Sequence, residues 1–299
     1  MNTFLLAAVT LGERVDSIFY NFDLWVFSFF GHMQCGFLTA VAKIFTSFGD
    51  EMFVIPMAAF GLVLCLFKKT RKYGAALIFS IVIGTLITNV IVKPMFLRIR
   101  PYNTLQGVAE YFAWYKGAGM LSESDYSFPS GHTTAAFEIA MSMCLCFKKD
   151  NKKFYWVFPI IALCTMGSRV YLMVHYASDV LAGFIVGTFA GCMGYLLATL
   201  ACKLVEKSKF LDKIDVTPLF KKVNPKVAPV AIVAVVVGIF CLSYIPAMTE
   251  GGESAHRCAY VGEYDCMNEA KVDDKDYPPI DGKEYCKIHW KQLSGVKIK

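Results

Sequence analysis

Long apolar blocks alternate with short polar stretches over most of the chain. Six blocks come close to the roughly 17–25 mostly apolar residues that a membrane-spanning helix needs. They are Phe53–Phe67, Ala75–Phe96, Thr133–Phe147, Phe154–Leu172, Val180–Cys202 and Val227–Ile245. The pattern predicts an all-α fold, a polytopic transmembrane helical bundle with about six spans.

The segment Ser17–Phe48 fits this pattern less clearly. It is apolar, but polar residues interrupt it at Asn21, Asp23, His32, Gln34 and Lys43. One span near Trp25–Phe48 and a pair of helices lying in the membrane interface are both compatible with it, and the interruptions favour the interfacial pair. The side of the membrane on which the N-terminus lies stays open.

Lysine and arginine residues gather in three connections between the apolar blocks. These clusters are Lys68, Lys69, Arg71 and Lys72, then Lys148, Lys149, Lys152 and Lys153, and finally seven lysines from Lys203 to Lys226. Because these connections alternate with the others, they fall on one side, which the positive-inside rule makes the cytoplasm. The loop Tyr102–Phe128 and the region Arg169–Asp179 then face outward. Asp50 and Glu51 are expected to form a solvated outer turn.

The composition also indicates a membrane protein. Charged residues make up 18% of the 299 residues and hydrophobic residues 56%, whereas a soluble domain carries about 25% charged residues. The formal net charge of +6 resides in short clusters between apolar blocks. We therefore expect the lipid bilayer to be the partner, and not nucleic acid. None of these patterns indicates an oligomeric state.

The chain is expected to divide into five parts. Residues 1–52 form the interfacial helices or first span, 53–202 the membrane core, and 203–226 a basic cytoplasmic loop. Residues 227–246 form an additional membrane helix, and residues 247–299 a polar tail of different composition.

Several cations lie at the outer ends of predicted spans, where the positive-inside rule does not favour them. Lys93 and Arg100 are seven residues apart, which puts them on one face if the helix continues to Pro101. Arg98 lies between them, and Arg169 ends another span. Snorkelling to the interface explains any single cation equally well, but the group indicates an anionic partner.

A helix start and a His–Asp pair complete this group. Ser130 is suited to cap the span that follows it, and Gly131 lets a ligand approach the backbone N–H groups there. His132 comes next, so an anion site and a proton donor are expected at this helix N-terminus. His175 and Asp179 are four residues apart, a spacing at which the carboxylate can fix one imidazole tautomer.

Together these residues provide what phosphoryl transfer needs. Lys93, Arg100 and Arg169 can neutralise phosphate oxygens, while one histidine attacks and the other moves protons. No carboxylate cluster for Mg²⁺ is evident beside them, so we expect the cations to replace a catalytic metal. An anion channel or permease would use the same cations as a selectivity site, but permeation does not need a His–Asp pair.

The motifs resemble those of the type 2 phosphatidic acid phosphatase (PAP2) superfamily, whose pocket is shared by the soluble vanadium haloperoxidases. The three motifs are Lys93 with Arg100-Pro101, then Pro129-Ser130-Gly131-His132, and finally Ser168-Arg169 with His175 and Asp179. The resemblance covers about Gly49 to Cys202. It implies the helical bundle of that family around these motifs.

The resemblance further implies a membrane lipid phosphatase without a metal cofactor for catalysis. In that reading His175 forms a phosphohistidine, Asp179 orients it, and His132 protonates the leaving group and then activates water. The phosphate oxygens would be bound by Lys93, Arg100, Ser130, Gly131 and Arg169. Phosphatidate, phosphatidylglycerol phosphate and polyprenyl diphosphates such as undecaprenyl diphosphate are compatible substrates, and a phosphotransferase is an alternative. The implied location is a bacterial cell membrane, with the site facing outward.

Glu138 lies inside an apolar span, where an ionisable group is costly and faces protein or a cavity. Two interpretations stay open for it. It either supports the site around His132 or forms a buried hydrogen bond between helices, for example with Asn89 or Tyr171.

The polar tail carries three cysteines and a histidine that match a structural zinc site. They are Cys258, Cys266, Cys286 and His289. The two residues between the last cysteine and the histidine are a spacing typical of tetrahedral zinc ligands. The alternative is one disulfide with a free thiol, as an oxidising exterior would produce.

Overall fold

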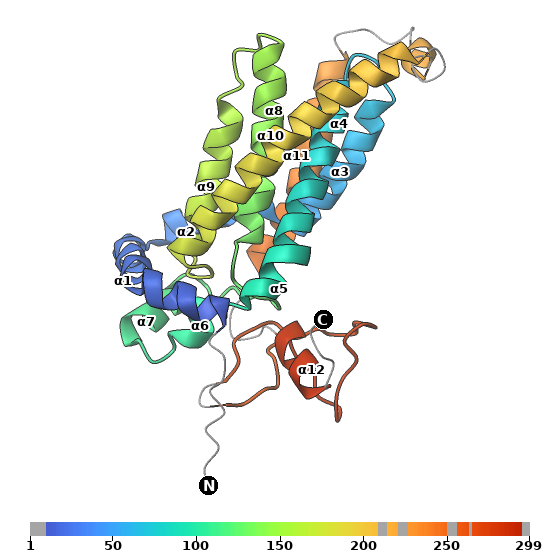
Figure 1. The fold of residues 1–299 in the computed structure, drawn as a ribbon. Helices are drawn as coiled ribbons and strands as arrows, with labels where there is room; N and C mark the ends of the chain where they lie inside the picture. The colour runs from blue at the N-terminus through green and yellow to red at the C-terminus, as the bar shows by residue number, and fades with distance from the viewer. Residues whose placement is uncertain (1–9, 209–213, 221–226, 250–255, 263–264, 295–299) are drawn as a thin grey trace.

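The computed structural model describes residues 10–208, 214–220, 227–249, 256–262 and 265–294 (Figure 1). Within this part of the chain the regular elements are helices, and β pairing is limited to three isolated bridges in the tail. The helices are α1 (Leu11–His32), α2 (Gly36–Thr46), α3 (Glu51–Cys65), α4 (Arg71–Thr85), α5 (Lys93–Phe96), α6 (Pro101–Thr104), α7 (Ala109–Gly117), α8 (Gly131–Lys149), α9 (Val157–Tyr171), α10 (Ala177–Lys207), α11 (Val227–Thr249) and α12 (Lys287–Leu293). The all-α fold class predicted from the apolar blocks is confirmed.

The bundle consists of α3, α4, α8, α9, α10 and α11, which run side by side (Figure 1). Helix α10 packs mainly against α4 and α8. A side-chain carbon at Gly187 would lie 2.5 Å from the carbonyl oxygen of Thr134, and one at Gly194 would lie 2.6 Å from the backbone nitrogen of Ser80. Small residues at such crossings let membrane helices pack backbone against backbone. The helix that carries Asp179 is thereby held against two neighbours.

Length and composition support a membrane-spanning bundle. Among the described residues, three segments are long and apolar enough to cross a membrane: Arg71–Thr104, Ala177–Lys207 and Val227–Ile245. The pair Gly36–Gly49 and Glu51–Cys65 adds a fourth if it is one span bent by 41°. Helix α9 is apolar but shorter. Each of the six predicted blocks overlaps one of the bundle helices, while the number of spans stays a prediction.

The described basic connections lie at one end of the bundle. The turn between α3 and α4, the turn between α8 and α9, and the end of α10 are together there (Figure 1). The starts of α8 and α10 lie at the opposite end, with α5 and α6. Part of the predicted basic loop, residues 209–213 and 221–226, lies outside the described residues. The alternation expected from the basic clusters therefore matches the arrangement of the described helices.

The segment Ser17–Phe48 forms two helices and not one. Helix α1 lies across the end of the bundle, near α6 and α7 (Figure 1). Thr10 caps it in a capping box, accepting from the N–H of Glu13 at 3.1 Å while the Glu13 carboxylate accepts from Thr10 at 2.7 Å. Helix α2 packs against α9. The depth of both helices in a bilayer stays a prediction.

The helix that carries Lys93 does not continue to Arg100. Leu97 has a φ of 53° and closes α5, and Pro101 is the first residue of α6. Proline is favoured at this position, because the N–H group that proline lacks would have no hydrogen-bond partner within the first turn of the helix. The expectation that Lys93 and Arg100 share a helical face is therefore wrong. The path of the chain brings the two cations together instead.

Candidate active site

His175 lies in the loop between α9 and α10, and its side chain is fully buried. Its Nδ1 is 3.4 Å from Oδ2 of Asp179, and its Nε2 is 3.0 Å from Nη1 of Arg100. A guanidinium group only donates hydrogen bonds, so Nε2 accepts and the ring proton resides on Nδ1, facing Asp179. Nε2 therefore carries the lone pair that a nucleophile needs.

The surroundings of His175 also keep the ring neutral. Burial, followed by the nearby charge of Arg100, lowers the pKa of His175 to about 4, and the hydrogen bond to Asp179 opposes this only in part. At neutral pH the imidazole is uncharged. The neutral form is the one that can attack an electrophile.

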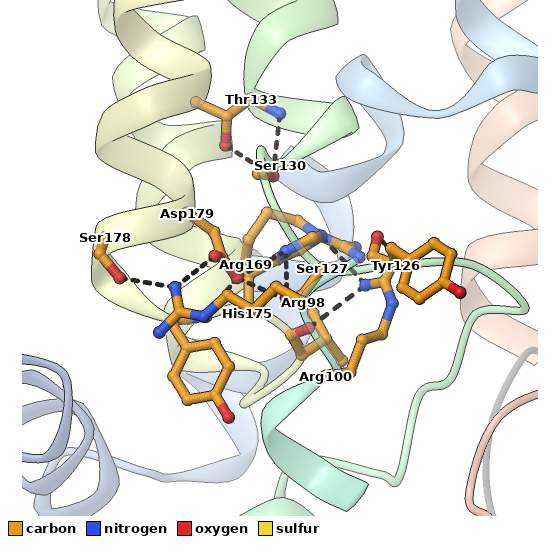
Figure 2. Close-up of polar contacts among 12 residues, drawn as sticks. Arg98, Arg100, Tyr126, Ser127, Ser130, Thr133, Arg169, His175, Ser178 and Asp179 are labelled. Atoms are coloured by element: carbon orange, nitrogen blue, oxygen red, sulfur yellow. Dashed lines mark hydrogen bonds and ion pairs between the residues drawn. The ribbon is translucent and has the colours of Figure 1, made fainter. Parts of the chain in front are cut away.

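Asp179 is held from several directions in addition to His175. Its Oδ2 accepts from the backbone N–H of Tyr176 at 3.0 Å and from the hydroxyl of Ser127. Its Oδ1 lies 2.6 Å from Nη1 of Arg98 (Figure 2). These contacts fix both carboxylate oxygens, so the orientation of His175 is fixed through them.

Arg98 is a site residue that the sequence analysis noted as a cation but did not place here. It is buried, and its Nε and Nη2 donate to Asp16 at 2.8 Å and Asp23 at 2.9 Å. Both aspartates belong to α1 and are seven residues apart, hence on one face of that helix. That spacing is the sequence signal that could have indicated a buried cation beside this helix. Arg98 thus connects α1 to Asp179.

The three cations predicted to bind phosphate converge, and carboxylates from the loop between α7 and α8 pair with them. Lys93 pairs with Asp125. Nη2 of Arg100 lies 2.6 Å from Oδ1 of Asp125 and also contacts Glu123. Arg169 pairs with Glu123 from the other side. The sequence analysis did not place Glu123 and Asp125 beside these cations, because they lie in a loop remote in sequence that folds back onto them.

Both loop carboxylates are ionised. Burial raises their pKa values, but the cations outweigh burial. Arg100 and Arg169 hold the pKa of Glu123 well below its usual range, and Lys93 and Arg100 do the same for Asp125. Two anions therefore lie where the sequence analysis expects phosphate oxygens.

His132 begins the first turn of α8 and faces the same group of charges. Its Nδ1 is 3.6 Å from Oε1 of Glu123, and its Nε2 is 3.6 Å from Oδ2 of Asp50. Asp50 also caps α3, accepting from the backbone N–H of Met52 at 2.7 Å. The sequence analysis expected Asp50 to lie in a solvated outer turn. The structure differs, because α3 and α8 begin side by side and Asp50 contacts His132.

The start of α8 has the geometry of an anion site. Ser130 is the N-cap, and its Oγ accepts from the backbone N–H of Thr133 at 3.4 Å. A side-chain carbon at Gly131 would lie 3.6 Å from Nζ of Lys93. The ammonium group and the positive end of the helix dipole therefore face the same space.

A cavity of about 110 Å³ leads from this group into the bundle. Lys93, His132, Glu138 and Asn89 are among the residues that line it. Oε2 of Glu138 is buried without a hydrogen-bond partner. The hydroxyl of Tyr171 instead bonds to the backbone of Cys35 and to Thr39. Of the two interpretations of Glu138, its place in this cavity favours support of the site.

Over the described ranges, potential metal ligands (His, Cys, Asp and Glu side chains) gather away from the candidate site. One group of at least three such side chains has its donor atoms within 4.8 Å of one another, and it lies in the tail: Cys258, Cys266, Cys286 and His289. At the candidate site the carboxylates of Glu123 and Asp125 contact Lys and Arg side chains instead.

Comparisons with known proteins identify the family of the chain. Residues 73–203 match the family model of the PAP2 superfamily. The undecaprenyl-diphosphatase of Sulfolobus acidocaldarius is 31% identical over 170 residues, which cover 56% of this chain and 75% of that protein. Phosphatidylglycerophosphatase B of Bacillus subtilis is 30% identical over 159 residues, covering 50% of this chain and 70% of that one.

A solved structure shares the fold. It is the crystal structure of a transmembrane PAP2-type phosphatidylglycerolphosphate phosphatase from Bacillus subtilis, with a TM-score of 0.50 and 24% sequence identity, covering 62% of this chain and 88% of that one. Together with the apolar helices, this likeness identifies an integral membrane protein. With a relative 31% identical over three quarters of its length, and with the motif residues of the family gathered at one end of the bundle, the chain belongs to the PAP2 superfamily.

Proposed function

We propose that this protein hydrolyses a phosphate or diphosphate group on a membrane lipid, without a catalytic metal and through a phosphohistidine on His175. The observation that carries the proposal is the pairing at that residue. Nδ1 of its buried, neutral ring faces Asp179, while Nε2 lies 3.0 Å from Nη1 of Arg100. Arg100 also contacts the loop carboxylates. A phosphate that replaces those carboxylates on Arg100 would come next to Nε2.

The contacts of Glu123 support this position for the phosphate. Its carboxylate contacts Arg100, Arg169 and His132 at once. Two phosphate oxygens on the arginines would receive bidentate, charge-assisted hydrogen bonds. The charge that develops on the equatorial oxygens during transfer is then stabilised by groups already in place.

The reaction proceeds in two displacements. In the first, Nε2 of His175 forms a bond to phosphorus while the bond to the lipid oxygen breaks, and His132 gives its proton to that oxygen. In the second, His132 takes a proton from water, the water oxygen attacks phosphorus, and the N–P electron pair returns to Nε2. Asp179 keeps the ring oriented and stabilises its positive charge during both steps. Inorganic phosphate is the product.

The substrate class is supported by the names of the relatives and by the apolar surface of the bundle. The relatives are named as phosphatases of undecaprenyl diphosphate and phosphatidylglycerophosphate, and the bundle exposes large apolar side chains such as Ile55, Ile185 and Leu242. A lipid can therefore remain among these helices while its headgroup enters the site. Phosphatidate, phosphatidylglycerol phosphate and polyprenyl diphosphate are the substrates to compare.

Orientation is part of the proposal. The basic connections lie at the end of the bundle opposite the site, so the positive-inside rule places the site on the outer face of a bacterial cell membrane. A reporter fused after Lys299 should be exposed outside, and one inserted at Asn151, in the turn between α8 and α9, should stay in the cytoplasm. The reverse pattern would overturn this orientation.

The test of the function is phosphate release from the three lipids by purified protein in detergent, without added divalent cations. Wild-type protein should release phosphate from at least one of them. His175→Ala should lower kcat by at least about 10³-fold, as loss of a catalytic nucleophile does. His256→Ala, at an exposed tail histidine, is the matched control and should keep wild-type activity. Turnover by the His175 variant would refute the assignment of the nucleophile.

A further inference from the structure

Four potential metal ligands meet in the tail. The sulfur atoms of Cys258 and Cys286 are each 3.4 Å from Nδ1 of His289, and the donor atoms of the whole set, with Cys266, lie within 4.8 Å of one another. The three cysteines are buried. Thiols at such distances around one ring nitrogen leave room for a single ion at their centre.

Local structure directs each ligand toward that centre. Cys286 is the N-cap of α12, which places His289 one turn further on. The ring of Tyr260 stacks on the ring of His289, with 3.9 Å between centroids and 5° between planes. A backbone hydrogen bond from Cys266 to the carbonyl of Tyr260, at 3.2 Å, turns the chain between the first two cysteines.

Apart from these ligands, the described tail residues have a small apolar core and little regular secondary structure to stabilise their fold. The buried cluster of the tail consists of the three cysteines and Ile288. Among the described tail residues, β pairing is limited to isolated bridges. Small modules of this kind depend on disulfides or a metal, because their apolar core is too small.

We propose that the tail binds one Zn²⁺ through Cys258, Cys266, Cys286 and His289, and that the zinc-bound tail holds the segment that carries Arg100. Three thiolates and one imidazole are a closed tetrahedral set typical of structural zinc. Asn268 supports it: this buried side chain donates from Nδ2 to the sulfur of Cys286 at 3.5 Å. Such contacts around the ligands orient them toward the metal.

Asn268 also connects the zinc ligands to the membrane core. Its Oδ1 accepts from Nδ2 of Asn103 at 2.8 Å, and Oδ1 of Asn103 accepts from the backbone N–H of Met267 at 2.8 Å. Asn103 lies in α6, and its backbone N–H donates to the carbonyl of Arg100 at 3.0 Å. A short chain of hydrogen bonds therefore runs from a zinc ligand to the backbone of Arg100.

A second contact reaches the loop that carries Glu123. Nη2 of Arg257, next to the first cysteine, donates to the carbonyl of Met120 at 2.8 Å. Ile99 and Tyr126 pack against the cysteine cluster. The tail thus touches the chain on both sides of the predicted phosphate site, and its folding by zinc orders that site. This coupling to activity rests on the proposed function, whereas zinc binding does not.

Zinc binding is tested on the full-length protein, purified in detergent, by elemental analysis and by intact mass under non-reducing conditions. We expect about one zinc per chain. Cys286→Ser and His289→Ala should each lose most of it. Cys241→Ala, at an exposed cysteine on α11, should keep it. Wild-type protein without zinc after purification in its presence, or a tail disulfide in the mass spectrum, would overturn the site.

The coupling is tested with Asn103→Ala, which leaves all four ligands and Asn268 in place. This variant should keep its zinc but lose several-fold in kcat/KM for the lipid phosphate, mainly through a higher KM. Glu110→Gln, at an exposed glutamate on α7, is the comparison, and it should keep the wild-type kcat/KM. An Asn103 variant with unchanged kcat/KM would overturn the coupling while zinc binding stands. Inactive wild-type protein that contains zinc would refute the proposed function instead.

Discussion

Nη1 of Arg98 lies 2.6 Å from Oδ1 of Asp179, and both side chains are fully buried. Arg98 is shared with Asp16 and Asp23 of α1. The carboxylate that orients His175 therefore depends on a cation that α1 holds in place. Removing one partner of such a buried pair leaves an uncompensated charge, which is far more costly than the pair itself is stabilising.

Arg98→Ala should destabilise the protein by about 3–5 kcal/mol, the usual cost of breaking a buried ion pair. Thermal unfolding in detergent measures this loss. Arg98→Lys keeps the charge but cannot reach three carboxylates at once, so we expect a folded protein with a lower kcat and a nearly unchanged KM. Arg14→Ala, at an exposed arginine on the same helix, should affect neither quantity. A wild-type kcat in the Lys variant would contradict the positioning role of Arg98.

Glu123 competes with phosphate for the same cations. Glu123→Gln removes the negative charge from Arg100, Arg169 and His132. Inorganic phosphate should then inhibit at a concentration about tenfold lower, since a change of about 1.4 kcal/mol in binding corresponds to tenfold. Inhibition of lipid hydrolysis by added phosphate measures the effect. Glu110→Gln, at an exposed glutamate on α7, should leave inhibition unchanged. An inhibition constant that stays the same or rises in the Glu123 variant would show that this carboxylate does not occupy the phosphate position.

The pH dependence of kcat/KM reports the free enzyme. Because burial and Arg100 lower the pKa of His175 to about 4, the neutral, nucleophilic form persists well below the usual histidine value of about 6.5. The activity that depends on neutral His175 is therefore present above this pKa and is lost as the pH falls through it. The ring nitrogen shifts of His175, followed by NMR against pH, should therefore titrate near 4, and kcat/KM should show no loss from this residue at pH 6. Titration near 6.5 would contradict the neutral, buried ring.

The sequence singles out the motif residues because their chemistry is out of place in an apolar chain. Lys93, Arg169 and His175 stand at the ends of apolar blocks, and the fold gathers these ends together. The capping role of Ser130 also follows from local sequence, since a cap acts on the N–H groups next to it. The all-α bundle follows from the apolar blocks in the same way.

What the sequence could not provide depends on contacts between distant segments. Glu123 and Asp125 lie in a loop whose path is set by tertiary packing, so nothing near them in sequence shows that they face Arg100. The break after α5 at Leu97 has no strong sequence signal either, because leucine rarely adopts a positive φ. The acids of α1 did carry a signal for Arg98, through their seven-residue spacing, but only the fold shows which cation they surround.

The most direct measurement is to trap the phosphoenzyme. Purified protein is mixed with lipid substrate labelled in its phosphate, quenched in base within one turnover, digested and sequenced by mass spectrometry. The account predicts one phosphorylated histidine, base-stable and acid-labile, at His175, and none in a His175→Ala protein. Label on His132, or on a carboxylate such as Asp179, would contradict it.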